Sequence, residues 1–397
     1  MPDNEGKKIR MVLVGYGGMG KQYAGMMADG GIEGLTLCGI CCRNQEGQQE
    51  IRQRYPYVRI YEDTDHMFDH AREFDGILIA TPHRTHVALG VRAFRQGLHV
   101  LVEKPVGVST MEAKQLLSAH RQAVETHSPL SREAGGRSRH PAKPAFAVMF
   151  NLRMLPVWRK AHEMIRGGSL GSLTSALWIR NDWYRSPCYH RSSPWRSSWT
   201  GEGGGMLINQ CQHDLDLWQW LFGMPESVRA DLGYGRFHSL CVDDSVELKF
   251  QYSGHLRGNY LASSGESPGV NRLEIWGTKG RLTVENNETL TFDENETATD
   301  EFARINQEIY GKPAHQSRNI ILEAPDNTYR LMLQNFADHI RYGRALDVPG
   351  EEGLNALELA NAAYLSSWFM EEIRLPIKDE VYQNALAAQV RLEKTLL

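Results

Sequence analysis

Three glycines near the N-terminus have the spacing of a dinucleotide-binding turn. Residues 12–20 read Val-Leu-Val-Gly-Tyr-Gly-Gly-Met-Gly, which is G-x-G-x-x-G directly after an apolar run and at the start of a helical pattern. Gly15 and Gly17 permit a tight turn and close approach of a pyrophosphate, Gly20 permits close helix–strand packing, and the helix N-terminus suits phosphate. We predict that NAD or NADP binds at a turn formed by Gly15, Tyr16, Gly17, Gly18, Met19 and Gly20. A tight turn without a ligand is the alternative.

The end of the next strand bears on which dinucleotide binds. An Asp or Glu about 20 residues after the glycines usually binds the ribose hydroxyls of NAD. Here the strand ends Ile-Cys-Cys-Arg-Asn at residues 40–44, with no acid. Cys42 cannot accept two hydroxyl hydrogen bonds, whereas Arg43 can meet a 2′-phosphate or cover the adenine ring. This pattern favours NADP over NAD, although Arg43 can also be a solvated arginine at a helix start.

Three further stretches carry a family resemblance. They are Ala-Thr-Pro-His-Arg-Thr-His at 80–86, His-Val-Leu-Val-Glu-Lys-Pro at 99–105, and Gly-Gly-Gly-Met-Leu-Ile-Asn-Gln-Cys-Gln-His-Asp-Leu-Asp at 203–216. Together with the glycine turn, they resemble the Gfo/Idh/MocA oxidoreductase family, of the glucose–fructose oxidoreductase and inositol dehydrogenase type. The resemblance covers about residues 8–375, apart from 128–144.

The resemblance implies a site and a substrate class. Lys104 matches the catalytic lysine and His213 the catalytic histidine, while Asn209 stands where the family has a catalytic aspartate. Asn209 cannot act as a base but can hydrogen-bond a substrate hydroxyl. Substrates are expected to be sugars, cyclitols or their derivatives, and an open sheet face is expected to form homodimers or homotetramers. The cofactor cleft is expected to include Thr81, Pro82, His83, His86, Glu103 and Lys104.

Oxidising a secondary alcohol moves a hydride to the nicotinamide and a proton to a base. Asn209, His213 and Asp216 have i, i+4, i+7 spacing, which predicts one shared helix face. We favour His213 as acid/base and Lys104 as hydrogen-bond donor to the reacting oxygen, although the two roles can be exchanged. Asp216 is either a partner of the histidine or a structural group.

Aromatic and polar residues alternate in a loop after the strand at 173–180. Aromatic faces with interspersed donors and acceptors suit sugar rings, and by resemblance Arg153 also points toward the cleft. The predicted substrate residues are Arg153, Trp183, Tyr184, Tyr189, Trp195, Arg196, Asn209 and His213, with Glu202 closing the loop. The alternative is a lid that packs on its own domain or on a neighbouring subunit. His83 and His86 have no third ligand nearby, so we predict no metal site.

Three functions remain open at this point. The first is an NAD(P)-dependent dehydrogenase acting on CH–OH groups. The second is redox-neutral glycoside cleavage or elimination through a transient keto-sugar, with the cofactor tightly bound. The third is a non-catalytic NAD(P)H-binding sensor, which the retention of Lys104 and His213 disfavours.

The surrounding elements predict an α/β domain followed by an α+β domain. Strands and helices alternate through the first 127 residues, and fully apolar strands in such an order form a parallel sheet. We therefore predict a Rossmann-type NAD(P)-binding domain at 1–150, with a flexible polar insert at 129–143. Closely spaced strands after residue 173 predict a large, mostly antiparallel open sheet. Residues 151–397 form this substrate-binding and oligomerisation domain, with C-terminal helices partly packing back on the first domain.

Composition limits the partners. The 397 residues include 44 Lys+Arg and 48 Asp+Glu, a net charge of −4, and 41% are hydrophobic. This balance excludes a mainly disordered chain and gives no reason to expect nucleic acid or a membrane as partner. Neither a long apolar run nor a signal-peptide pattern is visible, so we expect a cytoplasmic protein with six reduced cysteines.

Overall fold

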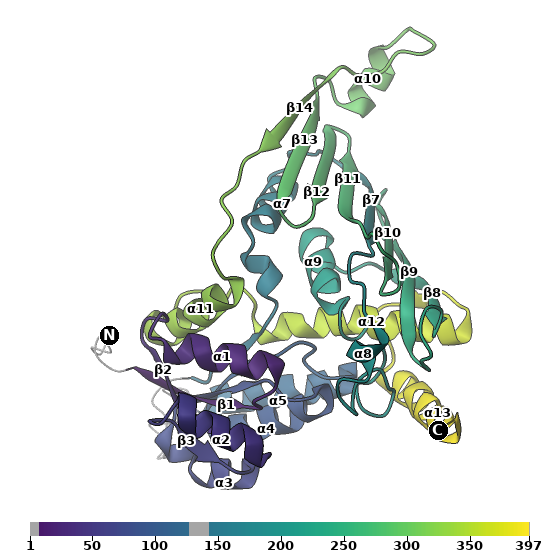
Figure 1. Ribbon diagram of the computed structural model, residues 1–397. Helices are drawn as coiled ribbons and strands as arrows, with labels where there is room; N and C mark the ends of the chain where they lie inside the picture. Colours follow the sequence, from purple (N-terminus) through teal and green to yellow (C-terminus); the bar gives the residue numbers. More distant parts are fainter. Residues whose placement is uncertain (1–7, 127–142, 397) are drawn as a thin grey trace. The chain divides into compact units, whose positions relative to one another are not determined.

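The computed structural model describes residues 8–126 and 143–396 (Figure 1). The chain divides into two compact units. The first contains the described residues up to Asn151 together with Asn327–Leu354, and the second contains Leu152–Asp326 and the residues from Asn355 onward. The insert predicted at 129–143 lies outside the described residues, except for Lys143.

The first unit is built on a six-stranded sheet in the order β3-β2-β1-β4-β5-β6, in which every neighbouring pair is parallel. Its strands are β1 (Ile9–Val14), β2 (Leu35–Cys41), β3 (Arg59–Tyr61), β4 (Gly76–Ile79), β5 (His99–Val102) and β6 (Phe146–Val148). The central strands β4 and β5 are wholly buried, as their apolar runs predict. Strand order reverses between β1 and β4, and dinucleotides bind beyond the carboxyl ends of strands at such a point. This confirms the predicted Rossmann-type sheet.

Helices flank these strands, and the last of them comes from late in the chain. The helices are α1 (Gly18–Ala28), α2 (Gln45–Arg54), α3 (Thr64–Asp69), α4 (His86–Arg95), α5 (Thr110–Thr126) and α11 (Thr328–Tyr342). Arg330 of α11 forms an ion pair with Asp29 at 2.5 Å. The Tyr329 ring packs edge-on against Tyr23 of α1, with ring centroids 5.8 Å apart. These contacts make α11 part of the first unit.

The second unit contains a nine-stranded sheet in the order β14-β13-β12-β11-β7-β10-β9-β8-β15. Its neighbouring strands are antiparallel except for β7 and β10, which confirms the predicted mostly antiparallel sheet. The strands are β7 (Leu173–Arg180), β8 (Ser227–Tyr234), β9 (Asp243–Gln251), β10 (Arg257–Ser263), β11 (Asn271–Gly277), β12 (Gly280–Glu285), β13 (Thr289–Asn295), β14 (His315–Ile320) and β15 (Ile373–Arg374).

Helices α7 and α9 lie against one face of this sheet (Figure 1). Trp158 of α7 contacts Trp178 of β7 with ring centroids 5.1 Å apart, and Trp218 of α9 contacts Phe250 of β9 at 4.6 Å. The helices of this unit are α7 (Pro156–Arg166), α8 (Pro187–His190), α9 (Gln212–Phe222), α10 (Thr299–Ile305), α12 (Gly353–Phe369) and α13 (Asp379–Leu396). Among the described residues, no helix combines the length and apolar character that a membrane span requires.

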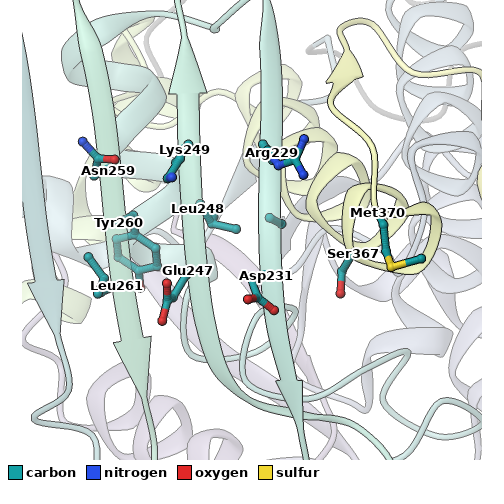
Figure 2. A pocket seen from close by; sticks show the side chains of 11 residues that line it. Arg229, Asp231, Glu247, Leu248, Lys249, Asn259, Tyr260, Leu261, Ser367 and Met370 are labelled. Carbon is teal, nitrogen blue, oxygen red and sulfur yellow. The ribbon is translucent and has the colours of Figure 1, made fainter.

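The side chains of the other sheet face alternate with those that pack on the helices. Residues from β8, β9 and β10, with Ser367 and Met370, line a hollow of about 440 Å³ there (Figure 2). Arg229, Asp231, Glu247 and Lys249 are exposed on this face, whereas Val228, Leu248 and Phe250 are buried on the opposite one. This period-2 pattern is the expected signature of a sheet covered on one side only.

Candidate active site

The glycine turn after β1 leaves room for a pyrophosphate. Gly15 has φ +101°, and a Cβ there would lie 2.6 Å from the Ala80 carbonyl oxygen. A Cβ on Gly20 would lie 2.1 Å from the Gly15 carbonyl oxygen, so both positions require glycine. At Gly17 and Gly18, by contrast, a Cβ would meet nothing within 4 Å. The N-terminus of α1 therefore opens on free space, and these residues fit a dinucleotide phosphate.

At the end of β2, the two residues considered for cofactor choice have different environments. Cys42 is buried, its thiol approaches the Asn44 carbonyl oxygen at 3.6 Å, and burial raises its pKa. Arg43 is exposed. Asn44 caps α2 by accepting a hydrogen bond from the Gly47 N–H at 2.6 Å. At this strand end, the exposed guanidinium of Arg43 can reach a ligand, whereas the Cys42 thiol is packed inward.

The loop after β5 is fixed by a buried carboxylate. Glu103 accepts hydrogen bonds from the Tyr23 hydroxyl of α1 and from the Lys104 backbone N–H, the latter at 3.0 Å. Burial raises the pKa of Glu103. Because Tyr23 lies on the helix that begins at the glycine turn, these contacts join the turn to the backbone of Lys104. Glu103 was predicted to contact cofactor, and in the structure it holds the loop that carries Lys104.

His86 occupies a similar bridging position. It is fully buried, with Nδ1 2.8 Å from the Pro105 carbonyl oxygen and Nε2 2.7 Å from the Thr81 carbonyl oxygen. Burial lowers the pKa of its imidazole. Both ring nitrogens therefore face backbone carbonyls, and His86 links the loop after β4 to the loop after β5. Near it, the Thr81 hydroxyl lies 2.6 Å from that of Thr85, and His83 is also buried.

In the second unit, a buried aspartate shapes the glycine-rich segment before α9. Asp243 accepts hydrogen bonds from the N–H groups of Gly205 and Leu207, at 2.9 and 2.6 Å. A Cβ on Gly205 would lie 2.1 Å from the Asp243 carbonyl oxygen. The expectation that Asn209 shares a helix face with His213 was wrong, because α9 begins at Gln212. Asn209 lies in the preceding turns, and His213 lies in the first turn of the helix, where it is partly exposed.

Asp216 is the partner of Arg153. The guanidinium donates two hydrogen bonds to the carboxylate, from Nε at 2.7 Å and from Nη2 at 2.5 Å. Both side chains are 1% exposed. Gln219 donates a third hydrogen bond to Asp216 at 3.3 Å. A bidentate pair so deeply buried joins the segment before α7 to α9, so Arg153 has a structural role in this geometry.

The Tyr189 hydroxyl is the centre of a polar cluster beside Asn209. Arg196 Nη1 donates to it at 3.0 Å and Gln210 Nε2 at 2.8 Å. Asn209 Nδ2 lies 3.3 Å from the same oxygen and 2.6 Å from Glu202 Oε1. Three nitrogen donors therefore surround the Tyr189 oxygen, so its own O–H is left to act as a donor.

These features can be compared with known proteins. Residues 9–128 match the family described as an oxidoreductase family with an NAD-binding Rossmann fold, and residues 158–283 match the GFO/IDH/MocA C-terminal domain. The chain belongs to the Gfo/Idh/MocA oxidoreductase family. As a family member it has the cofactor-binding fold that its glycine turn predicts.

Relatives span most of the chain at low identity. A scyllo-inositol 2-dehydrogenase (NADP(+)) of Bacillus subtilis is 23% identical over 367 residues, 90% of this chain and 94% of the relative. The rhizopine catabolism protein MocA of Rhizobium meliloti is 27% identical over 279 residues, 69% of this chain and 77% of the relative. The WlbA dehydrogenase of Bordetella pertussis, solved with NADH and UDP-GlcNAcA, is 23% identical and has a TM-score of 0.73. That match covers 94% of this chain and all of the other.

In this Gfo/Idh/MocA member, the aromatic loop before α9 is held by charged groups. The Arg180 guanidinium lies over the Trp183 ring at 4.1 Å, and that of Arg196 lies over the Trp195 ring at 4.6 Å. Tyr184 is 52% exposed. Glu393 of α13 accepts hydrogen bonds from the backbone N–H groups of Trp199 and Thr200, both at 2.7 Å. The loop is thus anchored by contacts within its own unit.

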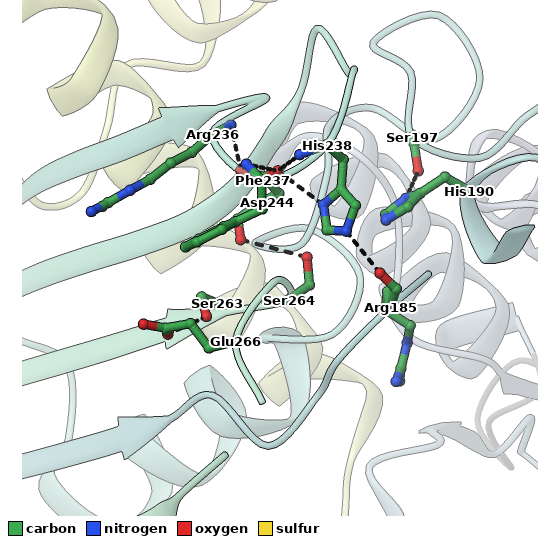
Figure 3. Close-up of polar contacts among 10 residues, drawn as sticks. All are labelled: Arg185, His190, Ser197, Arg236, Phe237, His238, Asp244, Ser263, Ser264 and Glu266. Atoms are coloured by element: carbon green, nitrogen blue, oxygen red, sulfur yellow. Dashed lines mark hydrogen bonds and ion pairs between the residues drawn. The ribbon is translucent and has the colours of Figure 1, made fainter. Parts of the chain in front are cut away.

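A histidine cluster supports the same loop (Figure 3). His238 places Nδ1 3.0 Å from Asp244 Oδ2 and Nε2 2.7 Å from the Arg185 carbonyl oxygen. His190 Nδ1 lies 2.7 Å from the Ser197 hydroxyl, and burial, with the nearby His238, lowers the His190 pKa to about 4. His190 is therefore neutral at physiological pH, and the cluster orders the loop around Tyr189.

Several of these residues were missed in the sequence. Tyr23, Gln210, Asp243 and His238 carry no spacing signal, because their partners lie far along the chain or in a loop of irregular structure. Family motifs pointed to Lys104, His213 and Asn209 but not to the groups that hold them. Within the described ranges 8–126 and 143–396, no three His, Cys, Asp or Glu side chains cluster to hold a metal ion.

Proposed function

We propose that this protein is an NAD(P)-dependent oxidoreductase that interconverts a secondary alcohol and a ketone on a sugar, a cyclitol or a derivative of one. The connection from the glycine-turn helix through Tyr23 and Glu103 to the Lys104 backbone carries this proposal. It fixes a lysine at the carboxyl end of β5, in the unit that has the dinucleotide turn. A dehydrogenase needs such a fixed donor near its cofactor.

We propose a role for each residue of the site. When bound, the nicotinamide accepts or supplies the hydride. Lys104 donates a hydrogen bond to the reacting oxygen, and His213 takes or returns the hydroxyl proton. Asn209 accepts a hydrogen bond from a substrate hydroxyl, and the Tyr189 hydroxyl donates one. Aromatic side chains of the loop stack on the C–H faces of the sugar ring.

The relatives support this substrate class. One is a scyllo-inositol dehydrogenase, which acts on a cyclitol, and the WlbA structure holds a nucleotide sugar acid. The polar cluster of Tyr189, Gln210 and Arg196 is suited to ring hydroxyls.

For the cofactor, we propose that NADP is preferred over NAD. The buried Cys42 thiol cannot hold the two ribose hydroxyls, whereas the exposed Arg43 guanidinium can bind a 2′-phosphate. The Bacillus subtilis relative is named as an NADP(+) enzyme, and WlbA was solved with NADH. Tyr16, whose pKa burial raises to about 12, stays protonated and lies 3.3 Å from Glu50 beside this site.

We propose that two copies pair through the uncovered face of the nine-stranded sheet. Arg229 lies opposite Lys249, and Asp231 lies opposite Glu247, so like charges face each other across β8 and β9 (Figure 2). Such pairs destabilise an isolated sheet. Arg229 and Lys249 form a basic row across the two strands, and Asp231 and Glu247 form an acidic row beside it. A two-fold axis that runs between the two rows would place the basic row of one copy against the acidic row of the other. The hollow on this face is then filled by the second copy.

A substrate screen tests the proposed activity. A panel of sugars, cyclitols and sugar acids is incubated with NAD or NADP, and formation of reduced nicotinamide is followed by absorbance. Turnover of a panel member, lost in Lys104→Met, supports a dehydrogenase. Conversion of a glycoside without net formation of NADH or NADPH would instead favour the redox-neutral reaction. Cofactor binding without conversion of any panel member would favour the sensor.

A further inference from the structure

We propose that Glu202 is a positioning residue that fixes the orientation of the Asn209 amide, and so makes Asn209 a hydrogen-bond acceptor toward the substrate. This inference rests on the proposed function. It gives a carboxylate to a site in which the family aspartate is replaced by asparagine.

The contacts of Glu202 are well defined. Its side chain is 3% exposed. Oε1 accepts a hydrogen bond from Asn209 Nδ2 at 2.6 Å, and Oε2 accepts one from the Ser197 backbone N–H at 2.6 Å. Arg196 Nη1 lies 3.8 Å from Oε1 and provides a positive charge. Both oxygens receive donors, so the pocket is built for an ionised carboxylate.

An ionised carboxylate accepts hydrogen bonds and cannot donate them. Asn209 must therefore turn Nδ2 toward Glu202, and the Tyr189 hydroxyl oxygen, 3.3 Å from Nδ2, is compatible with the same orientation. Oδ1 is then the amide atom with which Asn209 accepts a hydrogen bond from a substrate hydroxyl. In this way Asn209 provides one hydrogen-bond acceptor, as an aspartate oxygen would, but it brings no negative charge next to the substrate.

The variant Glu202→Gln separates this role from simple packing, because its shape is nearly unchanged. Glutamine has one amide oxygen for two donors, the Ser197 N–H and Asn209 Nδ2. If that oxygen stays with Ser197, the new NH₂ faces Asn209 and turns Oδ1 inward. Asn209 then presents N–H groups to the substrate, and we expect kcat/KM to fall roughly ten- to hundredfold, the scale of a charge-assisted hydrogen bond.

The reciprocal exchange should restore the arrangement. Asn209→Asp alone puts two carboxylates in hydrogen-bond contact, so it should also lose activity. In the double variant Glu202→Gln/Asn209→Asp, the amide at 202 donates to the carboxylate at 209, which keeps an oxygen for the substrate. We expect kcat/KM within a few-fold of the wild type. The pH profile should gain an acidic limb, because the carboxylate at 209 must now be ionised.

The experiment measures kcat, KM and the pH profile for all four proteins on a substrate found in the panel. Glu266→Gln is the matched control, since Glu266 also accepts a hydrogen bond from an asparagine, Asn181, at 3.0 Å, but is exposed. It should leave kcat/KM unchanged. The proposal is overturned if kcat/KM of the double variant is no higher than that of the worse single variant, or if the double variant keeps the wild-type pH profile.

A stability measurement keeps this inference distinct from the proposed function. Urea unfolding of the same four proteins gives a double-mutant cycle that needs no substrate. Non-additive changes in unfolding free energy, with the double variant more stable than Asn209→Asp, support the amide–carboxylate pair. Additive changes overturn it, even where the panel yields no substrate and the proposed function has failed.

Discussion

Replacing Arg153 with methionine should destabilise the second unit strongly. The substitution leaves Asp216 without its bidentate partner in a position where both side chains are 1% exposed. Removing one member of a buried ion pair costs about 3–5 kcal/mol, because the remaining charge is neither solvated nor neutralised. Gln219 still donates to Asp216 at 3.3 Å, so we expect the lower half of that range. About 3 kcal/mol corresponds to a roughly hundredfold shift in the unfolding equilibrium.

Urea unfolding followed by circular dichroism measures this loss. The double variant Arg153→Met/Asp216→Leu should recover part of it, because apolar residues of similar volume replace a buried pair at little cost. Arg166→Met removes an exposed arginine from the end of α7 and should change the unfolding free energy by no more than about 0.5 kcal/mol. Wild-type stability in Arg153→Met, combined with a raised KM, would refute the structural role and return Arg153 to the substrate site.

Three further predictions concern catalysis, cofactor choice and assembly. Lys104→Met should keep cofactor affinity and lower turnover about a hundredfold or more, and a loss of only a few-fold in steady-state rate would contradict its assignment. Arg43→Ala should lower the affinity for NADP roughly ten- to hundredfold and leave the affinity for NAD almost unchanged, whereas Cys42→Asp should raise the affinity for NAD relative to NADP. If titration shows that Arg43→Ala loses equal affinity for both cofactors, Arg43 covers only the adenine ring. If two copies pair as proposed, Lys249→Glu should lower the mass measured by light scattering to that of a monomer, and Lys249→Glu/Glu247→Lys should restore the dimer mass. A single variant of unchanged mass would place the interface elsewhere.

Much of the fold could be predicted because its elements have strong local signals. The glycine turn, the apolar strands and the helix Gly18–Ala28 lie where the residue pattern puts them. The edge strand β14 was missed because all but the last of its residues are exposed and its sequence, His-Gln-Ser-Arg-Asn-Ile, shows no alternation. Helical spacing suggested a helix at Asn209, but the glycines at 203–205 fold around Asp243 and delay its start to Gln212.

The candidate site was predictable only in part for a related reason. Family motifs identify residues such as Lys104 and His213 that are expected to perform the chemistry. The residues that hold them are fixed by contacts between distant segments, which no local pattern encodes. Arg153 and Asp216 are 63 positions apart, and Tyr23 and Glu103 are 80 apart. The sequence shows that each of these residues is present, but it does not show which distant residue each one contacts.

The return of Asn327–Leu354 to the first unit has a consequence for synthesis of the chain. The Val148 N–H donates to the Val348 carbonyl oxygen at 3.4 Å, Ala147 forms a bridge with Pro349, and Arg330 pairs with Asp29. A ribosome therefore completes the entire nine-stranded sheet except β15 before it produces the segment that closes the first unit. Until residues 327–354 are made, nothing from that segment pairs with the edge of β6 or packs on the face of α1 that carries Tyr23. We expect fragments that end near residue 151 to aggregate, and co-expression with a 327–354 peptide to improve their recovery.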